Sequence, residues 1–265
     1  MGIPASDYVE LPDLALLKKF DIPAPRYTSY PTADRFTREF GPADYEQALE
    51  SRKDEPLQKA LSLYVHVPFC SDVCYYCGCN KIVTRDHGRA TEYLDEVGHE
   101  MDLVKKHITG DLEIEQLHFG GGSPTFLDND ELERVMHSIT SRFALKAGGE
   151  FSIEVDPRSC PADKIVKLHE LGLNRMSVGV QDLNEDVQKA VNRIQPYGLV
   201  KDTMDAARAN GFGSINMDLI YGLPLQTEKT FARTIEQVIE LSPDRIALYH
   251  YAHLPNHFKP QRMIH

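Results

Sequence analysis

The sequence lacks two features that mark exported and membrane-bound proteins. Its first twenty residues contain Pro4, Asp7, Glu10, Pro12 and Asp13, so they lack the apolar central segment of a signal peptide. No stretch approaches the roughly eighteen apolar residues that a membrane-spanning helix needs. The sequence therefore predicts a cytoplasmic protein that does not enter a membrane.

The chain also lacks an excess of basic residues. Its formal net charge is −11 over 265 residues, whereas proteins that bind nucleic acids or lipid surfaces present a basic face. We therefore expect neither kind of partner. Hydrophobic residues make up 42% of the sequence and charged residues 26%, which is the composition of a soluble globular protein with a buried core.

Cysteine is scarce and unevenly placed. Four of the five cysteines fall within residues 70–79, "CSDVCYYCGC", and the fifth is Cys160. In a reducing cytosol, thiols clustered in this way bind metal more often than they form disulfides. The sequence therefore predicts a metal site at 70–79. Cys160, beside Pro161 at the start of a predicted helix, is interpreted as a structural thiol.

Apolar segments of strand length alternate with helical patterns along most of the chain. This alternation predicts a parallel sheet, because its crossovers run to one side. We expect an α/β fold, an open, partial TIM-type (β/α)6 barrel, although the pattern alone leaves a doubly wound sheet open. The predicted strands cover 61–67, 114–119, 150–155, 175–180, 214–220 and 245–251, and the predicted helices cover 89–107, 128–142, 161–171, 184–210 (broken near Pro196) and 227–240.

The segment before residue 60 has a different pattern. Two short helical stretches, near 11–19 and 42–53, flank the irregular sequence "IPAPRYTSYPT". We expect an N-terminal extension over residues 1–58 and a core over 59–265. The sequence stops just after the sixth strand, and a strand without a covering helix leaves apolar surface open. We therefore also expect that a C-terminal domain is missing.

Polar or glycine-rich motifs follow each predicted strand. The carboxyl ends of parallel strands face the ligand in α/β folds, so these motifs predict one ligand site on that edge of the sheet. In strand order they are the cysteine segment, "GGGSP", "EVDP", "GVQD", "DLIYG" and "YAHLP".

The cysteine spacing distinguishes between kinds of metal site. Structural zinc ligands usually come as two well-separated pairs, and the ferredoxin spacing places two residues between each of the first three cysteines. Neither matches residues 70–79, so we favour a [4Fe–4S] cluster and keep zinc as the alternative. Cys70, Cys74 and Cys77 are the predicted ligands. Three ligands leave one iron open to a small molecule and free Cys79 for another task, so Cys79 is our candidate catalytic residue.

The motif C-x3-C-x2-C after the first strand resembles that of the radical S-adenosylmethionine enzymes. Within them, an ordered set of motifs from about residue 24 to the end is similar to the oxygen-independent coproporphyrinogen III oxidases. The set comprises "PRYTSYPTA" (25–33), "YVHVPFC" (64–70), "CYYCGCNKIVTR" (74–85), "LHFGGGSPTFL" (117–127), "SIEVDPR" (152–158), "SVGVQD" (177–182), "VNRIQ" (191–195), "NMDLIYGLP" (216–224) and "YAHLP" (251–255).

The resemblance implies a set of cofactor-binding residues. Glycines let backbone N–H groups approach a ligand, carboxylates accept from ribose hydroxyls, and a guanidinium forks a carboxylate. Alternatively, Glu154 and Asp218 cap helices or pair with Arg158 or other nearby bases, and Arg193 is a solvated helix residue. A first S-adenosylmethionine would meet Tyr64, Gly121 and Glu154, and a second would meet Tyr76, Gly122, Ser123 (where the family commonly has threonine), Gln181, Arg193, Asp218 and Ala252.

The resemblance also implies an activity, the oxidative decarboxylation of two propionates of coproporphyrinogen III to give protoporphyrinogen IX. The reduced cluster would split S-adenosylmethionine, and a 5′-deoxyadenosyl radical would remove a hydrogen beside the ring. We expect a monomer that receives electrons from a flavodoxin or ferredoxin-type protein. Arg26, Lys81 and Arg85 either grip propionates or are ordinary surface charges. The rival interpretations are a haem-carrying relative that does not decarboxylate and a non-catalytic metal-binding module.

Overall fold

The computed structural model describes residues 13–22, 30–54, 60–108, 110 and 112–264. Contacts divide the chain into two compact units, residues 1–48 and 49–265. The boundary that the sequence predicts at 58/59 lies outside the described residues and stays a prediction. The N-terminal part contains α1 (Leu14–Phe20), a short 3-10 turn (Ala33–Arg35) and the start of α2 (Pro42–Ser51).

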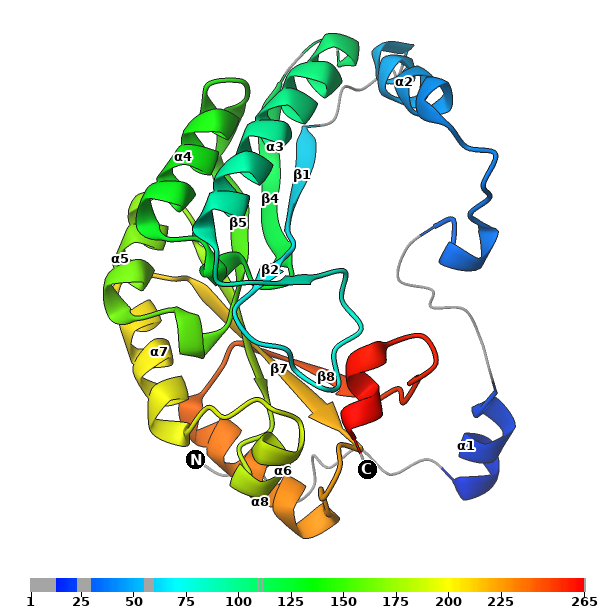
Figure 1. Ribbon diagram of the computed structural model, residues 1–265, viewed down its shortest axis with the longest axis vertical. Helices are drawn as coiled ribbons and strands as arrows, with labels where there is room; N and C mark the ends of the chain where they lie inside the picture. The colour runs from blue at the N-terminus through cyan, green and yellow to red at the C-terminus, as the bar shows by residue number, and fades with distance from the viewer. Residues whose placement is uncertain (1–12, 23–29, 55–59, 109, 111, 265) are drawn as a thin grey trace. The chain divides into compact units, whose positions relative to one another are not determined.

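The second unit contains a six-stranded parallel sheet whose spatial order is the order of the chain (Figure 1). A doubly wound sheet reverses its strand order at a switch point, and this sheet has no such reversal. The predicted partial barrel is therefore confirmed. The strands are β1 (Leu61–Val67), β4 (Glu113–Gly121), β5 (Ala144–Val155), β6 (Arg175–Gln181), β7 (Ser214–Tyr221) and β8 (Arg245–His250).

Helices connect successive strands, and α3, α4, α5 and α7 lie along one face of the sheet (Figure 1). The helix break expected near Pro196 is confirmed, because Pro196 is the N-cap of α7. The capping residues Asp128 and Thr227 begin α4 and α8 through capping boxes. The helices are α3 (His87–His107), α4 (Asn129–Thr140), α5 (Ala162–Glu170), α6 (Glu185–Ala190), α7 (Tyr197–Ala209) and α8 (Glu228–Leu241). None of the helices in the described part of the chain is long and apolar enough to cross a membrane.

Alternation along the strands separates the core from the opposite face of the sheet. In β6, Met176 and Val178 are buried in the hydrophobic core, whereas Ser177 and Gly179 line a cavity. In β7, Met217 is in the core and Asp218 lines the same cavity. Since successive side chains of a strand point to opposite faces, the core fixes the direction in which the polar residues point.

Two features differ from the sequence prediction. β5 begins at Ala144, six residues before the predicted start, because its first part pairs with β4 before a register shift. That first part, "ALKAGG", consists mostly of alanine and glycine, so it shows no alternation. The short strands β2 (Phe69–Cys70) and β3 (Ile82–Val83) pair in parallel and were not predicted, because two residues carry no periodicity.

The segment after β8 folds back toward the cysteine loop, with the red C-terminal turn beside the cyan loop in Figure 1. This turn is a 3-10 helix (Lys259–Met263). The Nε2 atom of the buried Gln261 donates to the backbone oxygens of Tyr76 and Ala252, at 3.0 and 3.1 Å. The side chains of β8 itself are largely exposed, Ile246 and Leu248 among them.

Candidate metal centre and its cavity

A cavity of about 330 Å³ lies at the carboxyl edge of the sheet. The segments after β1, β4, β5 and β6 contribute to its lining, as do residues of β7 and β8. All of the predicted site residues line it except Tyr64 and Ala252. One site therefore collects motifs that are spread over about 150 residues of the sequence, from Cys70 to Asp218.

The cysteine loop is closed at its base and anchored in its middle. The pairing of β2 and β3 closes it, and the N–H of Thr84 donates to the backbone oxygen of Cys70 at 2.9 Å. In the middle, the N–H of Tyr75 donates to the oxygen of Val191 at 2.9 Å, and Asn192 Nδ2 donates to the oxygen of Val73 at 2.7 Å. The loop is therefore held at several points while Cys70, Cys74 and Cys77 line the cavity.

The thiols of the loop differ in acidity. The pKa of Cys77 is lowered, chiefly by a hydrogen bond from the Cys79 side chain, and Cys77 Sγ also accepts from the Cys79 N–H at 3.4 Å. The same pairing raises the pKa of Cys79. Burial raises the pKa of Cys70 to about 12. Since metals bind thiolates, Cys77 is ready to ligate, whereas Cys70 has to release a proton.

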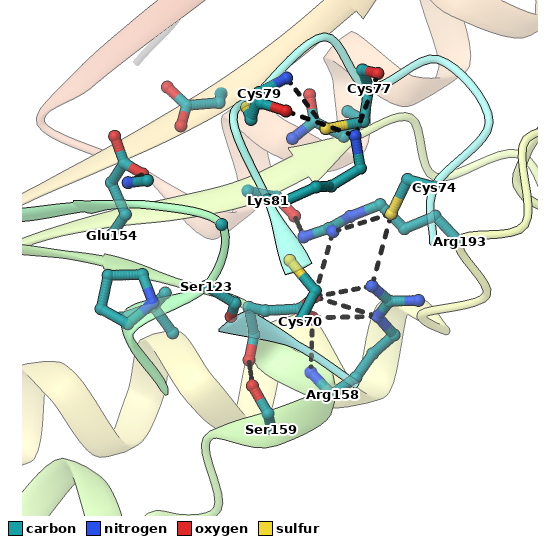
Figure 2. A pocket seen from close by; sticks show the side chains of 18 of the residues that line it. Cys70, Cys74, Cys77, Cys79, Lys81, Ser123, Glu154, Arg158, Ser159 and Arg193 are labelled. Atoms are coloured by element: carbon teal, nitrogen blue, oxygen red, sulfur yellow. Dashed lines mark hydrogen bonds and ion pairs between the residues drawn. The ribbon is translucent and has the colours of Figure 1, made fainter. Parts of the chain in front are cut away.

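Two arginines lie beside the sulfur of Cys74 (Figure 2), and one aspartate pairs with both of them. Arg158 Nη2 and Arg193 Nη1 each lie 3.5 Å from Cys74 Sγ. Asp156 Oδ2 accepts from the same two nitrogens, at 2.6 and 3.0 Å. The pKa of Asp156 is lowered: burial opposes the shift, and the two guanidinium groups outweigh it. The sequence left open, as an alternative, that Glu154 or Asp218 pairs with Arg158, but Arg158 pairs with Asp156.

Glu154 lies apart from this group in Figure 2 and approaches a glycine backbone. Its Oε2 accepts from the N–H of Gly121 at 3.2 Å. Gly121 has a φ of +122°, and a Cβ there would lie 2.9 Å from the backbone oxygen of Val67. Only glycine fits this position. The glycine motif at the end of β4 therefore places a backbone donor beside the carboxylate of Glu154.

Asp218 lies on the floor of the cavity and is held by neighbours on β6 and β7. Its Oδ2 accepts from Ser177 Oγ at 3.1 Å and its Oδ1 from Asn216 Nδ2 at 2.8 Å. Burial raises the pKa of Asp218, although both hydrogen bonds oppose the shift. The carboxylate of Asp218 is therefore held in place by two hydrogen bonds but remains poorly solvated.

The remaining candidates lie in varied surroundings. Tyr64, beside the cavity, stacks on His118 with ring centroids 5.8 Å apart, while Ala252 is exposed. Of the basic candidates, Lys81 lines the cavity and donates to the backbone oxygen of Cys77 at 3.3 Å. Arg85 pairs with Asp72 at 3.0 Å, with both side chains exposed, and Arg26 lies outside the described residues.

The whole constellation, three cysteines at the carboxyl edge of a partial barrel, has a match among protein families. The model of the radical SAM superfamily matches residues 64–238. The chain belongs to this superfamily.

Among the relatives that the chain matches are oxygen-independent coproporphyrinogen III oxidases. The chain is 48% identical to the one from Pseudomonas aeruginosa over 255 residues, which are 95% of this chain and 55% of that protein. It is 46% identical to the one from Escherichia coli over 252 residues, which are 95% of this chain and 54% of that protein. The chain thus spans about half the length of the curated relatives that it matches.

A solved structure of coproporphyrinogen III oxidase from Escherichia coli, described as a radical SAM enzyme, shares the fold. The TM-score is 0.87 at 45% sequence identity, and the match covers 96% of this chain and 56% of that one. A further solved structure, described as native anSMEcpe with bound AdoMet, matches at a TM-score of 0.52 and 13% identity over 77% of this chain and 58% of that one, which shows the fold alone.

Membership in the radical SAM superfamily implies a [4Fe–4S] cluster and S-adenosylmethionine, and the cavity fits both. Three thiols line it, one of them already acidic. Beside them Arg193 Nε is buried and has no hydrogen-bond partner among the described residues, so the cavity wall holds a donor for a further ligand. Polar groups for a bound cofactor, Glu154 and Asp218, line the cavity too.

Sequence reasoning missed three residues that shape the site: Asp156, Arg158 as a partner of the cysteine loop, and Gln261. The motif "EVDPR" places an acid and a base two residues apart at a strand end, which is a weak signal for an ion pair. Gln261 gave no signal at all. Its role depends on contacts with Tyr76, 185 positions away in the sequence.

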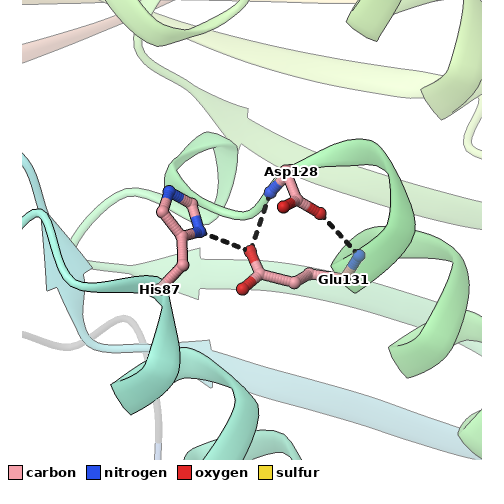
Figure 3. A group of neighbouring side chains, drawn as sticks. All are labelled: His87, Asp128 and Glu131. Carbon is pink, nitrogen blue, oxygen red and sulfur yellow. Dashed lines mark hydrogen bonds and ion pairs between the residues drawn. The ribbon is translucent and has the colours of Figure 1, made fainter.

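A second group of potential metal ligands, His87, Asp128 and Glu131, lies outside the cavity (Figure 3). Its geometry is explained by the start of α4, where Glu131 N–H donates to Asp128 Oδ1 and Asp128 N–H to Glu131 Oε2. Glu131 Oε2 also lies 2.9 Å from His87 Nδ1. Since the amino end of a helix repels cations, we interpret this group as a helix cap that joins α3 to α4.

Proposed function

We propose that this chain carries the radical chemistry of an oxygen-independent coproporphyrinogen III oxidase, with Cys70, Cys74 and Cys77 as ligands of the cluster. The observation that carries the proposal is the convergence of these three thiols in one cavity with Glu154 and Asp218. Relatives bearing that activity in their names are 46–48% identical over nearly the whole chain, which supports the same substrate.

When bound, the cluster and S-adenosylmethionine supply a reactive carbon radical for removing hydrogen from the substrate. The chain's own residues bind and orient. We propose that the Glu154 carboxylate accepts from the ribose of one S-adenosylmethionine while the neighbouring glycine backbone approaches the cofactor. Asp218, Gln181 and Ser123 would meet a second molecule.

Arg193 would serve this second site differently from the sequence expectation. Its guanidinium already contacts Asp156, Cys74 and the backbone oxygen of Gly179, the last at 2.6 Å. Of the three nitrogens of this guanidinium, Nε alone has no hydrogen-bond partner among the described residues. We propose that Arg193 offers this single donor to a ligand, instead of forking a carboxylate.

The substrate's propionates are anions, and a chain with a net charge of −11 must meet them with local positive charge. Lys81 is the described candidate that lines the cavity. Cys79 lines the cavity, and its pKa is raised whereas that of Cys77 is lowered. Cys79 is our candidate for a catalytic task beside the cluster. A flavodoxin or ferredoxin-type protein would supply electrons, and we expect a cytoplasmic monomer.

Anaerobic reconstitution with iron and sulfide, followed by S-adenosylmethionine and dithionite, tests the proposal. We expect 5′-deoxyadenosine, and we expect its amount to rise when coproporphyrinogen III is added. Cys74→Ala serves as the matched control without a cluster. Bound zinc in place of iron would favour the non-catalytic module. An intact cluster with tight haem binding and no response to coproporphyrinogen III would favour the haem-carrying relative.

A further inference from the structure

Within the described part of the chain, Cys74 is the one loop cysteine whose sulfur lies against two guanidinium groups. Arg158 Nη2 and Arg193 Nη1 approach it from two different segments, each at 3.5 Å. Cys74 and Arg193 are buried, and the Arg158 side chain is about one quarter exposed. Figure 2 shows both planar groups pointing at the same sulfur.

The charges around this sulfur do not cancel. Asp156 Oδ2 accepts from both guanidinium groups, so two positive charges share one negative charge. Coulombic interactions are stronger in a poorly solvated interior than in water. A net positive charge therefore remains next to the sulfur of Cys74, and it is held there by hydrogen bonds.

We propose that Arg158 is a positioning residue that, together with Arg193, raises the reduction potential of the cluster through the sulfur of Cys74, and that Asp156 limits this effect. The proposal rests on the proposed cluster site at Cys70, Cys74 and Cys77. Hydrogen bonds to ligand sulfurs and nearby charge both set the potential of iron–sulfur clusters. Nothing in the cysteine motif itself specifies these donors.

The proposal predicts opposite shifts for the two partners. Reduction by one electron adds negative charge to the cluster, and a neighbouring cation stabilises that charge. Arg158→Met removes one cation and one donor, so the potential becomes more negative. Asp156→Asn removes the compensating anion, so the potential becomes more positive. Arg158→Lys keeps the charge and loses the planar fork, so its shift is negative and smaller.

The experiment is a potentiometric titration of the reconstituted 265-residue chain, with the reduced cluster followed by electron paramagnetic resonance. At a fixed potential, we expect the ratio of reduced to oxidised cluster to fall about tenfold in Arg158→Met, which corresponds to about 59 mV for one electron. For Asp156→Asn we expect a rise. The control is Arg175→Met, which breaks an ion pair between β6 and Glu150 on β5; neither residue lines the cavity. This variant should leave the ratio unchanged.

The outcomes separate this inference from the proposed function. A wild-type chain that takes up no iron overturns both. A wild-type chain with a normal cluster, and a potential that Arg158→Met leaves unchanged, overturns only the role of Arg158. Shifts of the same sign in Arg158→Met and Asp156→Asn would show a loosened site instead of a charge effect. If Arg158→Met loses its iron, Arg158→Lys decides the matter by the sign of its shift.

Discussion

The four cysteines of the loop differ in what their loss should cost. Cys70→Ala, Cys74→Ala and Cys77→Ala each remove one of three proposed ligands, so we expect each to abolish most iron binding. Cys79→Ala should retain most of the iron, because Cys79 is not one of the three proposed ligands. Iron and sulfide analysis after anaerobic reconstitution checks this, with Cys160→Ala as a thiol-loss control outside the cavity. Equal loss in all four loop variants would indicate a four-thiolate site.

Asp218 should make stability depend on pH in a direction opposite to that of a carboxylate held by cations, such as Asp156, whose pKa is lowered. Burial raises its pKa above the ordinary 3.8, so its ionised form costs stability at neutral pH, and this cost disappears as the pH falls through the raised pKa. Asp218→Asn carries no charge. We therefore expect the variant without cofactors to be more stable than the wild type at pH 7, with the difference shrinking toward pH 4.

Urea denaturation at several pH values measures this difference. Asp205→Asn, which removes a carboxylate paired with Lys201 on the exposed face of α7, is the matched control and should show no such trend. A stability gain that is constant between pH 4 and 7 would mean that the charge of Asp218 is not its cause.

At the scale of elements, the C-terminal turn acts on the cysteine loop through one side chain. Gln261→Ala removes donors from the backbone oxygens of Tyr76 and Ala252. Both hydrogen bonds are partly buried, and a hydrogen bond contributes about 0.5–1.5 kcal/mol net, so the free energy of unfolding should fall by that order for each bond lost. We also expect faster alkylation of Cys77 in the metal-free chain, because its loop loses an anchor.

Lys259→Ala changes an exposed residue of the same turn and is the control for both measurements, denaturation and thiol alkylation. If the two variants behaved alike, the turn would not hold the loop. Gly78 offers an independent check, since a Cβ at this position would lie 3.0 Å from the ring of Phe258. Gly78→Ala should therefore disturb a second contact between the loop and the C-terminal segment.

The elements that could be predicted are those whose burial repeats with a regular period. β6 and β7 show it plainly, with alternate residues in the core. The start of β5 could not be predicted, because Gly148 and its neighbours interrupt the alternation. In the site, the cysteine and glycine motifs were visible because their chemistry is local. The pairing of Arg158 with Cys74 spans 84 positions and depends on how the strands stack, which no local pattern contains.

At the scale of the whole molecule, the described hydrophobic core lies entirely within the second unit, from Val65 to Val238. We therefore expect a chain without residues 1–48 to fold and to take up iron as the full chain does. The same deletion removes the motif "PRYTSYPTA", so turnover of coproporphyrinogen III should fall. Circular dichroism melting and iron analysis of both chains check the first expectation. Loss of cooperative melting in the shorter chain would contradict it.

Asp156 ties together segments that follow three different strands, since its two arginine partners and Cys74 come from separate parts of the chain. Replacements within such a group do not add: losing Arg158 alters what losing Asp156 costs, and the reverse holds too. In proteins that carry this site, we therefore expect most single substitutions within the group to destabilise it. The group should therefore be inherited as a unit, and it should be replaced, where it is replaced, by compensated pairs of changes.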